Sequence, residues 1–187
     1  MLQSARRRSA VFLCLSVSSF SCIYFIYDFE KTYFKLAEPT FLSPLALSSG
    51  ILQVRNDSNA KGFFFAKRDG GRHHKGIDFL VDEGRPILAS RSGRVSYAGI
   101  GKGYGLYVEI LHPEGFSTIY AHLSAISTQK GDWVEAGTII GLSGRTGNAD
   151  DSNIKPHLHY EIRLGDIPLN PAKNMMSPDI SIVNNLS

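Results

Sequence analysis

The sequence predicts an all-β domain of short, mostly antiparallel strands, folded into a β-sandwich-like arrangement with glycine-rich hairpins. Sixteen of the 18 glycines lie between Gly70 and Gly165, interleaved with short apolar runs. Gly, Pro or Asx turn signals bound those runs, and this part of the chain carries no long amphipathic helix pattern. Strands that alternate polar and apolar residues bury one face against another, which gives this class of fold.

The first 27 residues have the pattern of a membrane-inserting segment. Arg6, Arg7 and Arg8 precede Ser9–Tyr27, which contains no charged residue. About 18 to 20 residues, at about 1.5 Å rise each, cross a hydrocarbon core of about 30 Å. An uncleaved signal anchor and a cleaved signal peptide both fit, and a buried core helix is a third interpretation. We therefore expect a hydrophobic N-terminal helix ahead of the β domain.

Both membrane interpretations place the folded body outside the cytoplasm, either held in the cell envelope or secreted. An anchor would hold it on the periplasmic or extracytoplasmic side of the inner membrane, whereas cleavage would release it as a secreted protein. Both cysteines, Cys14 and Cys22, belong to this first segment. The body therefore contains no disulfide and no thiolate metal ligand.

The rest of the chain divides into three parts by composition. Residues 28–39 are aromatic and mixed in charge, as expected of a juxtamembrane spacer. Residues 40–175 form the β domain, and residues 176–187 are a polar segment that we expect to be a flexible tail. The predicted strands of the domain cover Phe63–Ala66, Gly76–Leu80, Arg94–Tyr97, Leu106–Leu111, Ser117–Ala121, Thr138–Ile140 and Leu158–Arg163.

The charge distribution argues against a nucleic-acid-binding protein. The chain has 20 Lys and Arg against 17 Asp and Glu, a formal net charge of +3. Three of the arginines lie in the first 27 residues, which contain no acidic residue, so the rest of the chain is neutral. Binding to nucleic acid requires a basic face on the folded part, so we expect no nucleic-acid partner.

One segment has an alternative interpretation. Residues Lys130–Gly141 resemble the Val-x-x-Gly-x-x-Ile-Gly hairpin of biotinyl and lipoyl carrier domains. Those carriers need an exposed lysine at the hairpin tip, in a Met-Lys-Met-like or Asp-Lys-Ala-like sequence, and no such tip occurs in this sequence. The segment therefore predicts a β-hairpin and not a carrier site.

Four histidines and one aspartate form three motifs in the predicted β domain. His74 precedes Asp78 by four residues, an even spacing that puts both side chains on one face of a strand or its entry. His157 and His159 are two residues apart and share a face for the same reason. His122 follows directly after another predicted strand. Each motif alone is a weak signal, but the three together indicate a shared site.

Two imidazoles and a carboxylate are a ligand set that Zn²⁺ uses in catalytic sites. Three protein ligands leave the fourth coordination position to water, whose pKa the metal lowers toward about 7. Five candidate groups for a three-ligand site leave two imidazoles over, and spare imidazoles suit proton transfer and oxyanion stabilisation. The motifs together therefore indicate a hydrolytic zinc site.

The order of the motifs resembles that of the LytM/lysostaphin-type zinc metallopeptidases, the M23 peptidases that cut peptidoglycan. The resemblance runs from about Phe41 to Pro171 and is collinear throughout. It is carried by GRHHKGIDF, the G-x-V-x-x-A-G run at 93–99, GKGYGLYVEILH, TIYAHLS, the G-D-x-V-x-x-G-x-x-I-G segment, GLSGRTGN, PHLHYEIR and LNP.

The resemblance implies a zinc-dependent endopeptidase that acts on peptidoglycan cross-links, with a peptidoglycan peptide as substrate. By resemblance, His74, Asp78 and His159 are the zinc ligands, and His122 and His157 are the two catalytic histidines. The alternative is a membrane-tethered, non-enzymatic module that binds peptidoglycan or activates another cell-wall hydrolase, because the family also contains members that have lost ligands. All five positions are filled here, which favours the enzyme.

Four other residues carry weaker expectations. His73 is an alternative ligand by count, but adjacent strand residues face opposite sides, which favours His74. His112 lies in the turn-like sequence His-Pro-Glu-Gly and is expected at the surface. Tyr104 and Arg145 are candidate substrate contacts.

Overall fold

The computed structural model describes residues 38, 40–46, 51–58, 61–176 and 179–182. The expected N-terminal hydrophobic helix lies outside these residues, as does the spacer apart from Glu38. Within the described part, no helix has the length and apolar character needed to cross a membrane. The strands belong to one compact unit, Thr40–Ser187.

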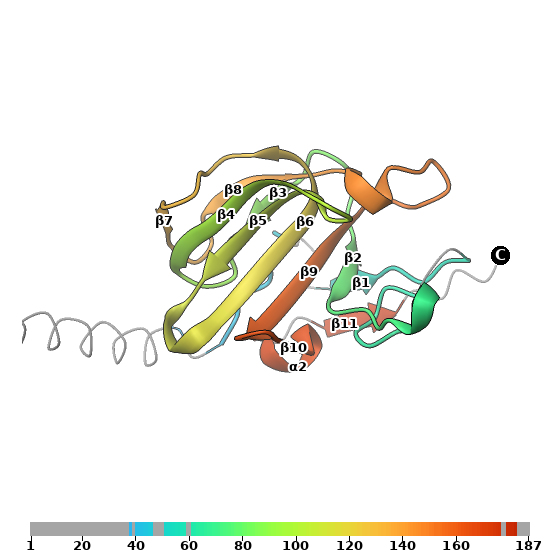
Figure 1. The fold of residues 1–187 in the computed structure, drawn as a ribbon, viewed down its shortest axis with the longest axis horizontal. Helices are drawn as coiled ribbons and strands as arrows, with labels where there is room; N and C mark the ends of the chain where they lie inside the picture. The colour runs from blue at the N-terminus through green and yellow to red at the C-terminus, as the bar shows by residue number, and fades with distance from the viewer. Residues whose placement is uncertain (1–37, 39, 47–50, 59–60, 177–178, 183–187) are drawn as a thin grey trace, which may run out of the picture. The chain divides into compact units, whose positions relative to one another are not determined.

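Eleven strands of the described residues form one connected sheet, in which every strand pair except β1–β11 is antiparallel (Figure 1). A single helical turn, α2 (Pro171–Asn174), is capped by the Asn170 side chain. The prediction of an all-β, mostly antiparallel domain is therefore confirmed. The strands are β1 (Ile51–Val54), β2 (Ile77–Leu80), β3 (Pro86–Leu88), β4 (Gly93–Gly101), β5 (Gly105–Leu111), β6 (Phe116–Ile126), β7 (Trp133–Val134), β8 (Ile139–Ser143), β9 (His157–Leu164), β10 (Ile167–Leu169) and β11 (Asp179–Ile182).

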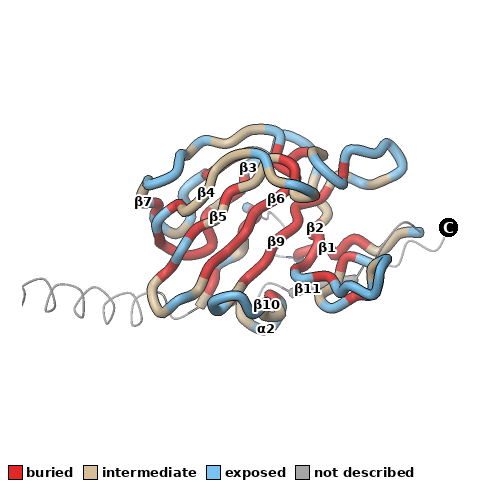
Figure 2. Tube along the Cα trace, in the orientation of Figure 1, coloured by how far each residue is buried: buried red, intermediate tan, exposed pale blue. Residues whose placement is uncertain are grey.

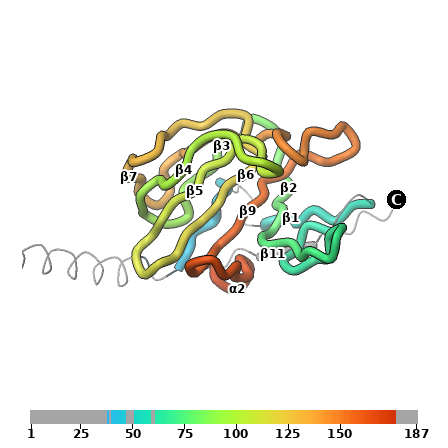
Figure 3. The backbone as a smooth tube through the Cα atoms, in the orientation of Figure 1, coloured from blue at the N-terminus to red at the C-terminus, as the bar shows by residue number. Residues whose placement is uncertain are grey.

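The central strand β9 lies between β2 and β6, which come from distant parts of the sequence. The order across the sheet is β11-β1-β2-β9-β6-β5-β4-β7, with β10 paired to β9. Strand β8 pairs with the end of β6 and with β3, so β3 joins the sheet through β8. Figure 3 shows β2, β9 and β6 running side by side. This order brings the three motifs of the sequence together.

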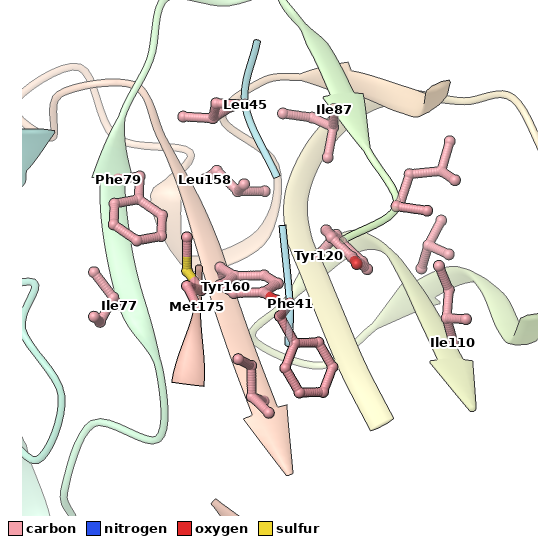
Figure 4. Close-up of a cluster of buried hydrophobic side chains, with 14 of the residues drawn as sticks. Phe41, Leu45, Ile77, Phe79, Ile87, Ile110, Tyr120, Leu158, Tyr160 and Met175 are labelled. Atoms are coloured by element: carbon pink, nitrogen blue, oxygen red, sulfur yellow. The ribbon is translucent and has the colours of Figure 1, made fainter. Parts of the chain in front are cut away.

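One face of the central strands is the hydrophobic core. From β9 it receives Leu158, Tyr160 and Ile162, each fully buried, while Ile77 and Phe79 come from β2. Ile87 of β3 and the Phe41 and Leu45 side chains of the preceding segment belong to the same cluster (Figure 4). Burial of one such side chain stabilises the fold by about 1.5–3 kcal/mol. The apolar residues of the alternating pattern therefore form the core that stabilises the sheet.

The polar half of the same pattern lies on the opposite face. In β9 it consists of His157, His159 and Glu161, and in β2 of Asp78. All four residues are buried, so these strands are covered on both faces (Figure 2). Burial of so many polar groups is costly unless they bind one another or a ligand, so this face is where the chemistry is expected.

One of the predicted strands is wrong. Phe63–Ala66 forms a turn, closed by the Ala66 N–H that donates to the Phe63 carbonyl at 3.3 Å. Phe65 adopts a left-handed backbone with φ of 65°, a conformation that excludes a strand. The apolar run signalled a strand because aromatic residues favour strands, but the local backbone follows a different set of hydrogen bonds.

The expected hairpin over Lys130–Gly141 is also wrong. Strand β7 pairs with β4, and β8 pairs with β3 and β6, so the two strands of this segment do not pair with each other. The connection between them binds elsewhere, since the Gly137 N–H donates to the Ala89 carbonyl at 2.8 Å. The two strands of this segment therefore pair with different strands of the sheet and not with each other.

Two further expectations concern His112 and the C-terminal tail. His112 is buried and not at the surface: its Nδ1–H donates to the Ser92 carbonyl at 3.0 Å, and its Nε2 lies 2.7 Å from Thr118 Oγ1. The segment 176–187, expected to be a flexible tail, includes strand β11, which pairs in parallel with β1. The alternation Asp-Ile-Ser-Ile is a strand signal, but it is short, and the polar composition of the whole segment obscured it.

Candidate metal centre and catalytic histidines

Three side-chain atoms converge at one point on the polar face. Nδ1 of His159 lies 2.8 Å from Oδ1 of Asp78 and 2.9 Å from Nε2 of His74. Nε2 of His74 lies 3.0 Å from the same Asp78 oxygen. All three residues are buried, and together they form a group that could hold a metal ion. The structure thus brings together the three residues assigned as ligands by resemblance.

The sheet register explains this convergence. Asp78 of β2 is directly paired with His159 of β9, so the two side chains leave the sheet on the same face. His74 precedes β2, where its N–H donates to the Ala66 carbonyl at 2.8 Å. The segment that carries the Phe63–Ala66 turn therefore holds His74 over the sheet.

Neighbouring acceptors determine which ring nitrogens carry protons. Nδ1 of His74 lies 3.0 Å from the Phe63 carbonyl, which can only accept, so Nδ1 is protonated and Nε2 is the inward-facing atom. Nε2 of His159 lies 2.8 Å from Oε1 of Glu161, so this nitrogen donates and Nδ1 is the inward-facing atom. Both rings therefore turn an unshared pair toward Asp78 when the site is deprotonated.

This donor set fits zinc. With ligand bonds of about 2.0–2.2 Å, the ligand atoms of a tetrahedral zinc ion are about 3.3–3.6 Å apart. The three atoms here are 2.8 to 3.0 Å apart and would need to separate by a few tenths of an ångström. Burial alone would raise the pKa of Asp78, but hydrogen bonds from His159 and His74 hold it well below its ordinary value. The carboxylate is therefore ionised, as a metal ligand must be.

His122 and His157 lie beside this group. The centroids of their rings are 4.9 Å apart, and the His122 ring is 5.9 Å from that of His159. Nδ1 of His122 donates to the Thr146 carbonyl at 2.8 Å, and Nδ1 of His157 donates to the Lys155 carbonyl at 2.8 Å. Each ring is thus anchored through Nδ1, which makes Nε2 the atom for proton transfer.

Both of these histidines are neutral near pH 7. Burial, with the charges of His159 and His157, lowers the pKa of His122 to about 3. Burial also lowers the pKa of His157 from its ordinary value. A neutral imidazole with a free Nε2 can accept a proton, which is the property that a general base needs.

The backbone at His122 is unusual for a residue of its size. Its φ is 63°, in the left-handed region that bulky residues rarely adopt. The pairing of β6 with both β5 and β8 is irregular next to this residue, around Leu123. Such irregularities re-aim a side chain at the rim of a sheet. Non-glycine residues in this conformation gather at functional sites, in keeping with the assigned role.

Two glycines position the carbonyl that anchors His122. Gly105 and Gly147 have φ of 65° and 68°, and a Cβ on Gly147 would lie 2.3 Å from the Gly105 nitrogen. The loop after β8 can approach β5 this closely because neither residue has a side chain. This close approach fixes the position of Thr146, whose hydroxyl also accepts from the Leu106 N–H at 2.8 Å. The two glycines of the sequence motifs therefore support a catalytic candidate indirectly.

The sequence interpretation missed Glu161, the second residue after His159. Its carboxylate accepts from His159 Nε2, from the Tyr104 hydroxyl at 2.7 Å and from Arg163 Nε at 2.7 Å. Burial would raise the pKa of Glu161, but the hydrogen bond and charge of His159 outweigh it and lower the pKa to about 2. The sequence does carry a signal for Glu161, because its even spacing from His159 in β9 places both side chains on the same face.

The remaining candidates lie elsewhere. His73 is exposed, and its ring stacks on Phe65 with the centroids 4.1 Å apart, outside the three-residue group. Tyr104, a candidate substrate contact, uses its hydroxyl to bind Glu161. Arg145 forms an ion pair with Glu83 at 3.8 Å and donates to the Asp151 carbonyl.

Two curated bacterial proteins are similar to this chain over its central part. The DD-carboxypeptidase/endopeptidase Mpg of Neisseria meningitidis is 44% identical over 100 residues, which are 54% of this chain and 22% of Mpg. The peptidoglycan DD-endopeptidase ShyA of Vibrio cholerae is 40% identical over 100 residues, with the same coverage of 54% and 22%. The chain thus matches about a fifth of the length of these relatives.

Solved structures share the fold. A zinc-containing peptidase from Vibrio cholerae superposes with a TM-score of 0.58 at 28% identity, covering 76% of this chain and 41% of that one. The catalytic domain of lysostaphin from Staphylococcus simulans gives 0.54 at 32% identity, covering 62% and 91%. The SpoIIQ–SpoIIIAH pore-forming complex contains a chain that matches with 0.59 at 28% identity, covering 74% and 92%.

The family comparison covers the residues that build the site. The model of peptidase family M23 matches residues 72–171, which include His74, Asp78, His122, His157 and His159. This match extends over more than half of the sequence. The chain therefore belongs to peptidase family M23.

Proposed function

We propose that this chain is a zinc-dependent peptidase that hydrolyses the peptide cross-links of bacterial peptidoglycan. The convergence of His74, Asp78 and His159, with two anchored and neutral histidines beside them, carries the proposal. Family membership and the similarity to Mpg and ShyA, whose names describe endopeptidases, support it. The proposal makes a peptidoglycan peptide the substrate.

The proposed ligands of Zn²⁺ are His74, Asp78 and His159. When bound, the metal would supply an activated water and polarise the scissile carbonyl. His122 and His157 would divide the proton transfers between them. One Nε2 would accept the proton of the attacking water. The other histidine would hydrogen-bond the developing oxyanion and help to protonate the leaving amine.

The remaining residues of the site hold these groups in place. Glu161 orients His159. Tyr104 and Arg163 each donate to the Glu161 carboxylate at 2.7 Å, and Arg163 also donates to the Tyr104 hydroxyl at 3.0 Å. The Phe63 and Thr146 carbonyls fix the rings of His74 and His122. Such a rigid arrangement keeps the reacting atoms aligned without reorganisation during the reaction.

We further propose that residues 1–27 attach the chain to the inner membrane, with the domain in the periplasm or on the extracytoplasmic side. Three arginines followed by 19 uncharged residues support this location. A cleaved segment would instead give a secreted enzyme. Peptidoglycan lies outside the cytoplasm, so either form would reach the proposed substrate.

A non-enzymatic role is the second candidate. It is favoured by the similarity to a chain of the SpoIIQ–SpoIIIAH complex, which is a protein assembly by its description. In this role the domain would bind peptidoglycan or a protein partner and activate another hydrolase. The filled set of five site residues favours the enzyme, because a binding module has no need for paired ligands and proton-transfer groups.

The deciding experiment is digestion of purified peptidoglycan by the full chain in mild detergent. Mass spectrometry of the muropeptides should show loss of cross-linked dimers, abolished by a chelator and restored by zinc. The His159→Ala variant is the control and should release nothing. Loss of terminal residues alone would indicate a carboxypeptidase, whereas no product from folded, zinc-loaded protein would contradict the peptidase and favour the second candidate.

A further inference from the structure

The two oxygens of Asp78 have different neighbours. Oδ1 belongs to the candidate metal site, where it lies 2.8 Å from His159 and 3.0 Å from His74. Oδ2 lies 3.4 Å from Nη2 of Arg68 and 3.8 Å from Nη1 of Arg55. The Asp78 side chain is 4% exposed, so these contacts are only weakly screened by water. One carboxylate therefore connects the candidate ligands to two guanidinium groups.

The two arginines differ in how their charge is balanced. Arg55 is buried and binds Asp57 through two hydrogen bonds, of 2.6 Å and 3.1 Å, so a second carboxylate offsets its charge. Arg68 is partly exposed, and its Nη1 donates to the neutral carbonyl of Lys61 at 2.7 Å. Arg68 is thus the group whose positive charge acts mainly on Asp78.

Backbone contacts fix the segment of the two arginines against Asp78. The Arg55 N–H donates to the Asp78 carbonyl at 2.8 Å, and the Asp78 N–H donates to the Gly62 carbonyl at 2.8 Å. A Cβ on Gly62 would lie 2.8 Å from that of Asp78, so a glycine is needed for this approach. Arg55 and Gly62 are therefore packed directly on Asp78, and the Arg68 side chain is held nearby by its hydrogen bond to the Lys61 carbonyl, next to Gly62.

We propose that Arg68 is a positioning residue that holds Oδ2 of Asp78 and draws charge away from the carboxylate. Asp78 then faces the metal through Oδ1 alone and donates less negative charge to it. The inference rests on the proposed zinc site. It predicts that loss of the Arg68 charge tightens zinc binding, whereas loss of a purely structural contact would weaken it. A cation beside a divalent ion weakens its binding, whereas a more weakly donating ligand leaves the ion a stronger electrophile.

The test compares zinc binding by the full chain and by the Arg68→Gln variant in mild detergent. Competition with a chromogenic chelator should show zinc bound roughly tenfold more tightly by the variant, the size expected for a unit charge near a divalent ion. Turnover of cross-linked muropeptides should show a lower kcat with little change in KM. A contact that merely maintained the structure would give weaker zinc binding instead.

Two variants serve as controls. Arg68→Lys keeps the charge near Oδ2 and should bind zinc as the wild type does. Arg72→Gln removes the same charge from an exposed arginine of the same segment, whose Nε donates to the Asp69 carbonyl at 3.2 Å and not to Asp78. It should also leave zinc affinity unchanged. Circular dichroism and thermal melting establish that each variant is folded.

Three outcomes would overturn the inference. Unchanged or weaker zinc binding by Arg68→Gln would show that the arginine does not reduce the charge of the ligand. Equal tightening in Arg72→Gln would show a general charge effect without a role for the Asp78 contact. A wild type that binds no zinc would overturn both proposals, whereas one that binds zinc and hydrolyses nothing would contradict only the proposed function.

Discussion

Glu161 and His159 form a carboxylate–imidazole pair on one face of β9, with Nε2 of His159 donating to Oε1 of Glu161 at 2.8 Å. Residues two apart in a strand point to the same side, so the pair needs no loop to bring it together. The hydrogen bond fixes the tautomer of His159 and turns Nδ1 toward Asp78 and His74. A carboxylate behind the ring therefore orients a candidate metal ligand.

The Glu161→Gln variant should lose about 10- to 100-fold in zinc affinity, because the orienting carboxylate becomes a neutral amide that competes poorly for the His159 proton. Competition with a chromogenic chelator measures this loss. Glu135→Gln, at an exposed position, removes the same charge and should bind zinc like the wild type. Equal affinities of Glu161→Gln and the wild type would contradict an orienting role.

Zinc should stabilise the folded protein, because the three ligand atoms converge in the native state alone. A free concentration about 100 times the Kd adds about 2.7 kcal/mol. For a chain of this size, that free energy corresponds to a rise in Tm of about 5–10 °C. Thermal melting of chelator-treated protein, with and without added zinc, measures the shift.

The Asp78→Asn variant should lose this response to zinc, since an amide is a poor ligand and carries no charge. Asp166→Asn, at an exposed position, is the matched control and should keep the full shift. If Asp78→Asn retained the same rise in Tm, the metal would be bound elsewhere, and the three-residue site would be wrong.

Much of this site follows from alternation that is visible in the sequence. In His157-Leu158-His159-Tyr160 the polar and apolar residues alternate, and the structure places them on opposite faces of β9 as expected. The pairing of Asp78 with His159 depends on sheet register instead, which one sequence does not determine. The motif order suggested the partnership only through resemblance to a family.

Other parts of the fold depend on contacts that no local pattern reveals. Phe63 and Phe65 belong to an aromatic run typical of strands, yet the turn there supplies the carbonyl that orients His74. His112 follows turn-forming rules of sequence, but its ring is buried between Ser92 and Thr118. In both cases long-range hydrogen bonds override the local preference, as tertiary contacts commonly do.

Replacing either proposed catalytic histidine should reduce turnover without releasing zinc. His122→Asn and His157→Asn should each lower kcat for cross-linked muropeptides by about 10²- to 10⁴-fold, because asparagine cannot carry a proton between water and the leaving amine. Asparagine also tolerates the left-handed backbone at His122. Zinc content per chain should stay at the wild-type level, as measured by atomic absorption.

The His73→Ala variant is the control for these two changes, since His73 is exposed and lies outside the group of convergent atoms. Its kcat should remain close to that of the wild type. Wild-type turnover in His122→Asn would remove that residue from the mechanism. Loss of zinc from the same variant would instead make it a ligand or a support for one.

Acid should destabilise the domain in part through His112. Burial is the main cause that lowers its pKa from 6.5 to about 4, despite the favourable hydrogen bond to the Ser92 carbonyl. The unfolded chain therefore binds a proton at pH values where folded His112 stays neutral, so stability falls as the pH drops from about 6.5 toward about 4. At pH 5 the loss relative to pH 7.5 should be about 2 kcal/mol.

Urea unfolding of chelator-treated wild type and His112→Gln, at pH 7.5 and at pH 5, isolates this contribution. The other buried histidines are present in both proteins, so their effects cancel in the comparison. The variant is expected to be less stable at pH 7.5, because glutamine fills the site between Ser92 and Thr118 less well. It should nevertheless lose about 2 kcal/mol less than the wild type on acidification. Equal losses in the two proteins would mean that folded His112 takes up its proton at an ordinary pH.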